Sequence, residues 1–278
     1  MTSDNKDLKP TEFERLTDQD DWTSTWAHVD AGPLVFNYKD PSFVDIDSLF
    51  HRHLPSDESL RFLEIGCCPG TYLRYFHDKF GYQVSGLDYL KAGCQETRAR
   101  CAADGLEADI IHADMFEFEC DDQYPPWDVV ASFGLIEHFD DIMPCLNRHI
   151  DLVRPGGYLA VVLPNHAGLN GTVLRCVDKK RYKMHNLMSW KDLRNGLEAT
   201  NRVEIIEGGH YNRIGFLNAG LYQKARALGK LPHFAVRAPM VLVEKAGRLL
   251  PNTPYFSPNI AVIARRIADE NTDETLAS

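Results

Sequence analysis

The residues best suited to bind a ligand through their backbone lie in a glycine-containing turn, Glu64-Ile-Gly-Cys-Cys-Pro-Gly70. An apolar run precedes this turn, and apolar side chains at helical spacing follow it from Thr71. Gly66 and Gly70 let backbone approach a ligand closely, and the helix N-terminus behind them offers free N–H groups. The turn therefore predicts a site for a small polar cofactor. Cys68 stands where a nucleotide-binding loop usually has its middle glycine, and we interpret it as a small buried residue rather than a reactive thiol.

Two acids follow the next apolar runs of the sequence. Asp88 lies eighteen residues beyond Gly70, at a place suited to accept hydrogen bonds from a ribose diol. Asp114 and Met115 follow a third run, where an acid and an apolar side chain could hold a purine. Each acid has an ordinary alternative role, because Asp88 could cap the next helix and Asp114 could form a turn. We favour the ligand-binding interpretation for both.

The elements that must position these residues follow a regular pattern between Leu60 and Leu163, where short apolar runs alternate with amphipathic segments. This pattern is typical of a parallel sheet covered on both faces. We expect strands at 61–65, 83–87, 109–112, 128–132, 158–163, 203–207 and 259–266, and helices near 71–80, 91–104, 141–153 and 190–200. The polar groups follow successive strands, so they should meet at the carboxyl edge of the sheet, where open α/β sheets bind ligands.

The predicted fold class is α/β, a Rossmann-like, mostly parallel sheet flanked by helices. We expect four parts: an N-terminal helical cap over 1–59, a cofactor-binding core over 60–165, a largely helical cap insertion with the final strands over 166–268, and a disordered tail over 269–278. The N-terminal helices are expected at 11–26 and 41–53, and a sharp turn at Pro155-Gly-Gly157. The segment 166–189 is expected to be irregular, and 210–250 mostly helical with interruptions at Pro232 and Pro239.

The ordered set of motifs closely resembles the class I S-adenosylmethionine-dependent methyltransferases between about Leu60 and Asn165. The resemblance is carried by the glycine turn, Asp88, Ala113-Asp-Met115, Glu137-His138 and the Arg154-Pro-Gly-Gly157 turn, in the correct order. It implies S-adenosylmethionine as the cofactor.

The resemblance also implies a role for each motif residue. Gly66, Cys68 and Gly70 would line the methionine and ribose portion of the cofactor. Asp88 would bind the ribose hydroxyls, with Tyr89 beside the adenine. The remaining roles are as follows: Asp114 and Met115 would bracket the adenine, Phe133 and Gly134 would pass under the methionine end, and Glu64 would orient the loop or contact the amino-acid end through water.

The transfer itself requires little chemistry from the protein. A sulfonium methyl is already activated, so such an enzyme mainly aligns donor and acceptor and excludes water. A general base helps when the acceptor is a hydroxyl. His138, with Glu137, is the first candidate because strand-four loops face the transferred methyl; a structural histidine capping the next helix is an equally favoured alternative. Further candidates, for acceptor binding, are His166, His185, His210, Tyr211 and Arg213.

No metal site is expected. Some quinone-biosynthesis O-methyltransferases have a similar Glu-His element, preceded by a further acid that helps to hold a metal. This chain has Gly134 at the comparable place. Asp140 and Asp141 follow closely, but acids near a helix start more often stabilise the helix dipole than bind a metal.

Charge is unevenly distributed along the chain. Its formal net charge is -10, which argues against nonspecific nucleic-acid binding. The segment 166–250 has 15 Lys and Arg against 6 Asp and Glu, a balance of +9. These residues, including 179–183 and Arg213, suggest an acceptor that carries a carboxylate or phosphate; solvated basic helix faces are the alternative. Aromatic residues Trp22, Trp26, Phe36 and Tyr38 are candidates for the pocket or for plain core.

The bulk composition is that of a soluble globular protein, with 278 residues, 44% hydrophobic and 25% charged. The polar start and the lack of any apolar run near ~20 residues predict neither a signal peptide nor a membrane span. The seven cysteines lack the paired spacing of a zinc site, so we expect reduced thiols in a cytoplasmic protein.

The predicted function is methylation of a small-molecule acceptor, preferably on oxygen, with nitrogen or sulfur as alternatives. An NAD(P)-dependent oxidoreductase is disfavoured because the loop lacks a full G-x-G-x-x-G pattern. Cys68 alone suggests a non-catalytic cofactor-binding subunit. Nucleic-acid methylation is disfavoured because Ser132-Phe-Gly-Leu135 lacks the Asn-Pro-Pro-aromatic element of many DNA enzymes. Oligomeric state, including a homodimer, stays open.

Overall fold

The protein is described here by a computed structural model. It describes residues 13–26, 34, 36–38, 43–216, 225–247 and 249–268. The predicted disordered tail over 269–278 lies outside the described residues, as do residues 1–12 of the predicted N-terminal cap.

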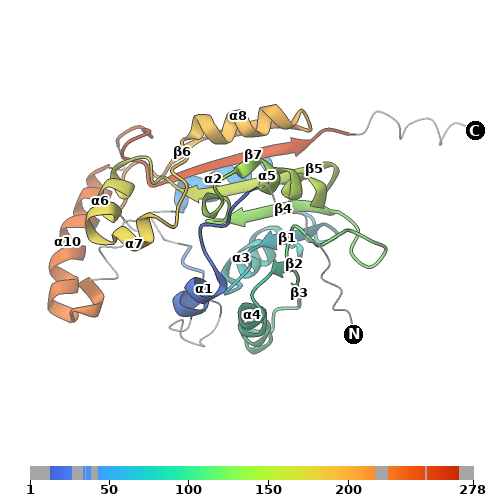
Figure 1. Cartoon of the computed structure of the whole chain (residues 1–278), viewed down its shortest axis with the longest axis horizontal. Helices are drawn as coiled ribbons and strands as arrows, with labels where there is room; N and C mark the ends of the chain where they lie inside the picture. Colours follow the sequence, from blue (N-terminus) through green and yellow to red (C-terminus); the bar gives the residue numbers. More distant parts are fainter. Residues whose placement is uncertain are drawn as a thin grey trace, which may run out of the picture.

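A seven-stranded sheet organises the chain, with strand order β3-β2-β1-β4-β5-β7-β6 (Figure 1). The bounds of the strands are β1 Arg61–Ile65, β2 Gln83–Asp88, β3 Ala108–His112, β4 Trp127–Phe133, β5 Val153–Pro164, β6 Val203–Tyr211 and β7 Asn259–Arg266. The strands from β3 to β5 are parallel, whereas β7 runs antiparallel to both β5 and β6. The predicted Rossmann-like fold is confirmed.

The order of the strands creates a topological switch between β1 and β4. From β1 the chain steps outward through β2 to β3, and then it returns to β4 on the other side of β1. At such a switch the loops after the two neighbouring strands diverge and leave a crevice at their carboxyl ends. The sheet therefore places the Glu64–Gly70 turn opposite the loop that follows Phe133.

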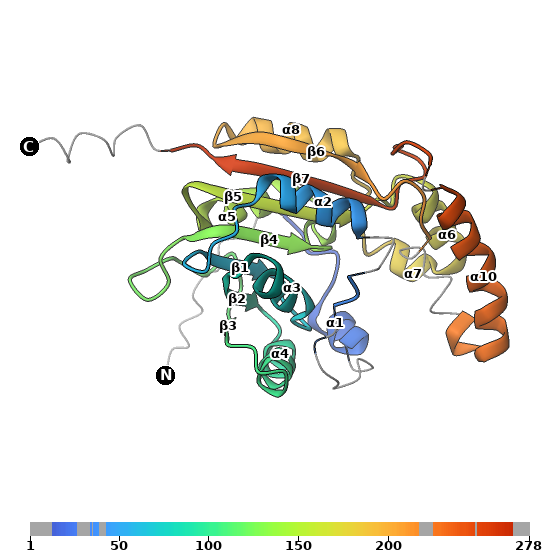
Figure 2. The same ribbon diagram turned by 180° about the vertical axis from the view of Figure 1, so that it is seen from behind.

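Helices cover both faces of the sheet. One face carries α2 (Val44–His53), α3 (Thr71–Phe80) and α4 (Lys91–Ala103), and the other carries α5 (Ile142–Leu152) and α8 (Trp190–Thr200). Figure 2, turned by 180°, brings α2 and α3 to the front. Two apolar cores result, one on each side of the sheet.

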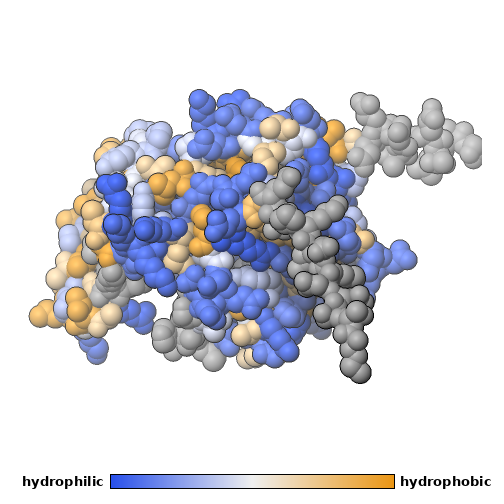
Figure 3. Space-filling view, in the orientation of Figure 1, coloured by the Kyte–Doolittle hydropathy of each residue, from blue (hydrophilic) through white to orange (hydrophobic). Residues whose placement is uncertain are grey.

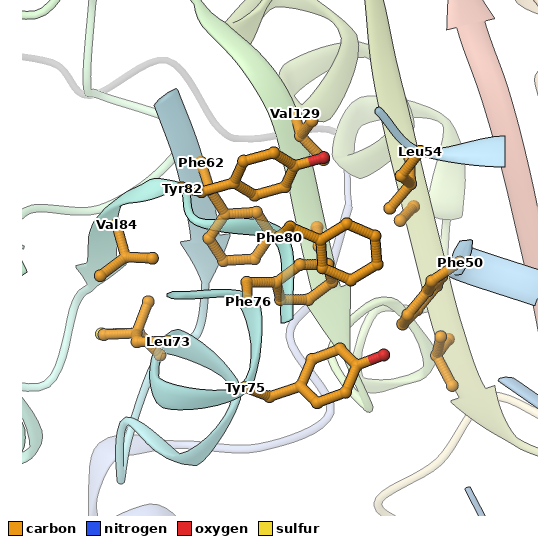
Figure 4. Close-up of a cluster of buried hydrophobic side chains, with 14 of the residues drawn as sticks. Phe50, Leu54, Phe62, Leu73, Tyr75, Phe76, Phe80, Tyr82, Val84 and Val129 are labelled. Atoms are coloured by element: carbon orange, nitrogen blue, oxygen red, sulfur yellow. The ribbon is translucent and has the colours of Figure 1, made fainter. Parts of the chain in front are cut away.

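Aromatic rings dominate the core under α2 and α3 (Figure 4). The rings of Phe62 on β1 and Phe76 on α3 stack with centroids 4.1 Å apart, and Phe50 from α2 lies 5.4 Å from Phe76. Large aromatic side chains bury much apolar area and pack in offset or edge-on pairs, which fixes α3 against the strand that precedes the glycine turn. This packing positions the turn between β1 and α3.

The segment before the first helix is irregular, not helical as predicted. The helix α1 spans Gln19–Trp26, whereas residues 13–18 lie along the loop after β4. Arg15 pairs with Phe139 as an isolated antiparallel bridge, and Leu16 N–H donates to the His138 carbonyl at 2.8 Å. These hydrogen bonds satisfy backbone groups that a helix would have used internally. The second predicted helix is present as α2, which begins at Val44.

The segment 166–189, predicted to be irregular, contains two helices, α6 (Leu169–Val177) and α7 (Lys179–Tyr182). Gly171 in α6 allows close packing of this helix. A Cβ atom on Gly171 would lie 1.7 Å from the carbonyl oxygen of His166, so only glycine permits α6 to fold back onto this residue.

Strand β6 is longer than predicted, and α10 (Lys230–Gly247) is not interrupted by its prolines. The ladder with β7 continues from Val203 to Tyr211, so His210 and Tyr211 lie in the sheet and not in a helical cap. Pro232 falls in the first turn of α10, where backbone N–H groups have no helical partner. The predicted turn Pro155-Gly-Gly157 lies within β5, at the place where the register of the β4–β5 pairing shifts.

The surface of α10 is unusually apolar. Leu231, Phe234 and Leu242 are 80%, 68% and 69% exposed. Figure 3 shows hydrophobic side chains gathered at this end of the molecule, beside α6. No helix in the described part of the chain combines the length and apolar character needed to cross a bilayer.

Candidate active site

A cavity of about 510 Å³ opens at the carboxyl ends of the central strands. Its wall includes nine of the ten predicted cofactor-binding residues and one predicted catalytic residue: Glu64, Gly66, Cys68, Asp88, Tyr89, Asp114, Met115, Phe133, Gly134 and His138. The helix α1 lies beyond these strand ends and contributes Trp22 to the wall (Figure 1). The volume of the cavity is in the range of sites for small ligands.

Backbone hydrogen bonds join the loops that form this wall. The Gly66 N–H donates to the Leu87 carbonyl at 2.8 Å, and the Ala113 N–H donates to the Asp88 carbonyl at 3.1 Å. The Gly134 N–H donates to the Val162 carbonyl at 2.8 Å. The loops after β1, β2, β3 and β4 are therefore held in register beyond the ends of their strands.

Gly66 and Gly70 both adopt a left-handed conformation, with φ of 75° and 90°. This region strains residues that carry a Cβ, so the turn requires glycine at both places. Gly70 is the N-cap of α3 and, unlike Gly66, does not line the cavity. Cys68 is buried in the cavity wall, and burial raises the pKa of its thiol to about 12. A thiol that stays protonated is a poor nucleophile, which agrees with a structural interpretation of Cys68.

Two buried carboxyl groups, Glu64 and Asp88, face the cavity. Burial raises the pKa of both, and the neighbouring Asp88 adds to the shift of Glu64. Asp88 accepts hydrogen bonds from the backbone N–H groups of Cys68 at 3.3 Å and Leu90 at 2.9 Å. Glu64 Oε2 has no hydrogen-bond partner. A buried acceptor without a partner is costly, so this wall favours a ligand that donates hydrogen bonds or carries positive charge.

A charged cluster closes another part of the cavity. The Arg15 guanidinium forms an ion pair with Asp114 and lies over the Tyr89 ring, 5.0 Å from its centroid. The second carboxylate oxygen of Asp114 accepts from the Phe116 N–H at 3.1 Å. Burial raises the pKa of the Tyr89 hydroxyl to about 12. Met115 is buried next to this cluster and provides an apolar surface.

Another part of the wall contains Phe133 and Gly134. The ring of Phe133 stacks on Tyr72 with centroids 3.6 Å apart and planes 7° apart. Gly134 has φ of 67°, and a Cβ atom there would lie 3.3 Å from Glu137 Oε1. The chain therefore turns sharply after β4, and Glu137 lies next to Gly134 without lining the cavity.

Glu137 and His138 are buried and carry shifted pKa values. Burial raises the pKa of Glu137 to about 8 and lowers that of His138 to about 3. His138 Nδ1 is 2.8 Å from the Met184 carbonyl oxygen, which can only accept, so Nδ1 carries the proton. The imidazole is therefore neutral at physiological pH, with Nε2 as its free acceptor.

The core of the chain is similar to known methyltransferases. A family model described as a methyltransferase domain matches residues 62–157. The ubiquinone biosynthesis O-methyltransferases of Salmonella arizonae and Ruegeria pomeroyi are 27% and 31% identical over 166 and 112 residues. These alignments cover 55% and 39% of this chain, and 66% and 44% of the relatives. Residues 62–157 therefore form a methyltransferase domain of the class I, S-adenosylmethionine-dependent type.

Solved structures agree with this family at the level of the fold. Geranyl diphosphate C-methyltransferase from Streptomyces coelicolor A3(2) has a TM-score of 0.54 and 14% identity, covering 90% of this methyltransferase and 98% of that chain. The complex of that enzyme contains S-adenosyl-L-homocysteine. The methyltransferase described here spans only part of the curated relatives that it matches in sequence.

Several predicted site residues of the methyltransferase lie outside the cavity wall. Glu137, His166 and His185 are grouped beside His138, behind the wall. His210 and Tyr211 lie in β6, and the Tyr211 hydroxyl donates to Glu207 at 3.1 Å. Arg213 is 3.5 Å from Asp45, between β6 and α2. None of these six lines the cavity.

The structure also adds residues that the sequence did not indicate. Arg15, Thr17, Asn37, Thr71 and Tyr72 contribute polar or aromatic groups to the wall, together with Asn259 from β7. Trp22 and Phe36, considered from the sequence, do line the cavity, whereas Tyr38 does not. The side chain of Trp26 lies outside the described residues. No local motif marks Arg15, because its partners Asp114 and Phe139 are 99 and 124 residues away in sequence.

Proposed function

We propose that the protein transfers the methyl group of S-adenosylmethionine to an oxygen atom of a small molecule. One observation supports this most directly: the cavity at the β1–β4 switch is lined by a left-handed glycine turn and by two buried carboxyl groups, one with an unpartnered oxygen. A ribose diol and an amino group both donate hydrogen bonds, so this wall suits the hydrogen-bonding groups of the cofactor. When bound, the cofactor supplies a methyl group activated by a positively charged sulfur.

Individual roles follow from position in the wall. Asp88 would accept hydrogen bonds from the ribose hydroxyls, and Glu64 would face the positively charged amino-acid end. The turn at Gly66 brings backbone against the cofactor. Asp114 and Met115 would flank the adenine, with Arg15 closing this end through its ion pair and its contact with Tyr89.

The acceptor side of the cavity is built to exclude water. Trp22, Phe36, Phe43 and Tyr72 surround it together with Phe133. Aromatic walls remove solvent around the reacting groups and hold donor and acceptor in one orientation. The cavity volume of about 510 Å³ favours a small acceptor over a macromolecule.

His138 is a weak candidate for the general base. Burial lowers its pKa to about 3, far from the neutral value at which proton transfer to an imidazole is efficient. The proposal therefore relies on an acceptor hydroxyl that ionises readily, such as a phenol. An amine or thiolate needs less help from a base, so N- or S-methylation is the alternative that the acceptor test must distinguish.

The basic helix α7 supports an anionic acceptor only indirectly. Residues 179–183 do not line the cavity, and Lys180 forms an ion pair with Asp21 of α1 at 3.1 Å. This pair connects α7 to α1, whose Trp22 lines the cavity. A carboxylate or phosphate on the acceptor would therefore have to reach the outer rim of the cavity.

The test is formation of S-adenosylhomocysteine in the presence of three matched acceptors: a phenol, an aniline and a thiophenol of the same ring size. We expect turnover with the phenol above the rate without acceptor, and methylated product of the matching mass. Turnover with the aniline or thiophenol alone would replace oxygen by nitrogen or sulfur. Cofactor binding without turnover on any of a broad acceptor panel would favour a non-catalytic subunit and contradict the proposal.

A further inference from the structure

Three potential metal ligands from two distant parts of the chain meet behind the cavity wall. Glu137 and His138 lie in η1 (Ile136–His138), and His185 lies in the segment between α7 and α8. One ligand atom from each residue can be chosen so that all three lie within 4.8 Å of one another. Glu137 Oε1 and His138 Nε2 are 3.9 Å apart, and the rings of His138 and His185 have centroids 4.7 Å apart.

Both histidines are oriented as metal-binding histidines usually are. His138 Nδ1 lies 2.8 Å from the Met184 carbonyl oxygen, and His185 Nδ1 lies 2.7 Å from the Arg181 carbonyl oxygen. A carbonyl only accepts, so each Nδ1 carries a proton and each Nε2 keeps a free lone pair. Such outer hydrogen bonds fix the tautomer and ring orientation of histidines that bind metals.

Backbone contacts hold the two parts of the cluster together. The Asn186 N–H donates to the Glu137 carbonyl at 2.6 Å. The Asn186 side-chain amide donates to the carbonyls of Phe139 at 3.0 Å and Asp140 at 2.9 Å. The segment that carries His185 is therefore fastened directly to the loop that carries Glu137 and His138.

Buried polar atoms without a hydrogen-bond partner lie in the cluster and beside it. Glu137 Oε2 and His166 Nδ1 are both buried without a hydrogen-bond partner. The His166 ring is adjacent, with its centroid 4.4 Å from that of His185. Burying an acceptor without a partner is unfavourable, and a cation bound at this place would remove the penalty for the carboxylate.

We propose that Glu137, His138 and His185 bind one divalent transition-metal ion, with Zn²⁺ as the best match to two imidazoles and one carboxylate. Zinc bonds of ~2.1 Å place tetrahedral ligand atoms ~3.4 Å apart, so the cluster must contract modestly when the ion binds. Three protein ligands leave a fourth position open. His138 belongs to both the cluster and the cavity wall, so the ion would lie next to the cavity.

This site differs from the sequence-based expectation of no metal. That expectation considered the position three residues before Glu137, where the chain has Gly134, and the acids Asp140 and Asp141. The additional ligand comes instead from His185, which is brought in by the fold. The binding is independent of the proposed function, because it needs neither cofactor nor acceptor.

The experiment titrates Zn²⁺ into the chelator-stripped full-length protein by calorimetry, without cofactor or acceptor. A parallel titration with Co²⁺ follows the visible absorption bands of a low-coordinate Co²⁺ site. We expect about one equivalent bound to the wild-type protein, in agreement with one cluster. His185→Ala should weaken binding by at least the ~10–100-fold that loss of a supporting outer hydrogen bond costs.

Two further variants complete the test. Glu137→Gln keeps the shape of the buried side chain and should also weaken binding, and its folding is checked by circular dichroism. His51→Ala, at a surface His–carboxylate pair with Asp47 on α2, is the matched control and should bind as wild type does. Equal affinity of the His185→Ala and wild-type proteins, displacement of Zn²⁺ by equimolar Mg²⁺, or no Co²⁺ bands would each overturn the proposal.

Discussion

Replacing Asp88 by Asn tests the proposed cofactor contact with little change in shape. The Asn carbonyl oxygen can still accept from the Leu90 N–H, which Asp88 Oδ1 accepts at 2.9 Å. The variant loses the negative charge and one acceptor, at Oδ2, whose protein contact with the Cys68 N–H is long at 3.3 Å. A hydrogen bond to a charged group contributes ~1.5–3 kcal/mol. We therefore expect S-adenosylhomocysteine to bind ~10–150-fold more weakly.

The assay is isothermal titration calorimetry with S-adenosylhomocysteine at pH 8, combined with thermal unfolding of each protein without ligand. Asp109→Asn is the matched control, because Asp109 is an exposed acid on the neighbouring strand β3 and does not line the cavity. Asp109→Asn should bind as wild type does. An Asp88→Asn protein with wild-type affinity and unchanged thermal stability would refute a ribose contact at this carboxylate.

Three further predictions use the same structure. Gly66→Ala should lower the free energy of unfolding by ~1–2 kcal/mol, because residue 66 has a positive φ. It should also weaken S-adenosylhomocysteine binding, since the new Cβ would lie 3.4 Å from Leu135 beside the cavity. Gly105→Ala, with φ of 64° and open space around it, should lose similar stability and keep its affinity for S-adenosylhomocysteine. Burial lowers the pKa of His166 from 6.5 to about 3, so its neutral form stabilises the fold above pH 6.5, and this stability is lost as pH falls toward 3. Between pH 6.5 and 5 the His166→Gln protein should therefore lose ~2 kcal/mol less unfolding free energy than the wild type. The measurement is urea unfolding at each pH in the presence of a chelator. Neutralising the three basic residues at 179–181 should raise the acceptor KM and leave the cofactor Kd unchanged.

Each of these predictions has a clear contrary result. Equal cofactor affinity for the two glycine variants would separate the turn at Gly66 from the binding site. Parallel stability curves for wild type and His166→Gln would mean that this histidine does not remain neutral in the fold. An unchanged acceptor KM after neutralising residues 179–181 would remove the support for an anionic acceptor.

The sheet and the loops that bring Gly66, Asp88 and Asp114 to one edge were predictable from the sequence. Each of these residues directly follows a short apolar strand, and parallel strands align their carboxyl ends. Strand bounds differ from the predictions mainly at β5 and β6. The individual cofactor contacts remain predictions, although the cavity contains nine of the ten residues chosen for them.

Contacts between distant segments were not predictable in this way. The ion pair of Arg15 with Asp114 depends on an irregular N-terminal segment that the sequence suggested to be helical. The approach of His185 to Glu137 depends on hydrogen bonds from the Asn186 backbone and side chain to the loop after β4. Neither contact has a local periodicity or spacing, so the sequence pattern alone contains no signal for it.

The most direct test of the central conclusion is equilibrium binding of the cofactor to the wild-type protein. Calorimetric titrations with S-adenosylmethionine, S-adenosylhomocysteine and NADH under one buffer condition compare the two cofactor classes. The structure predicts saturable one-to-one binding of S-adenosylmethionine and S-adenosylhomocysteine, and no binding of NADH at the same concentrations. Saturable binding of NADH without binding of either adenosyl compound would contradict the account.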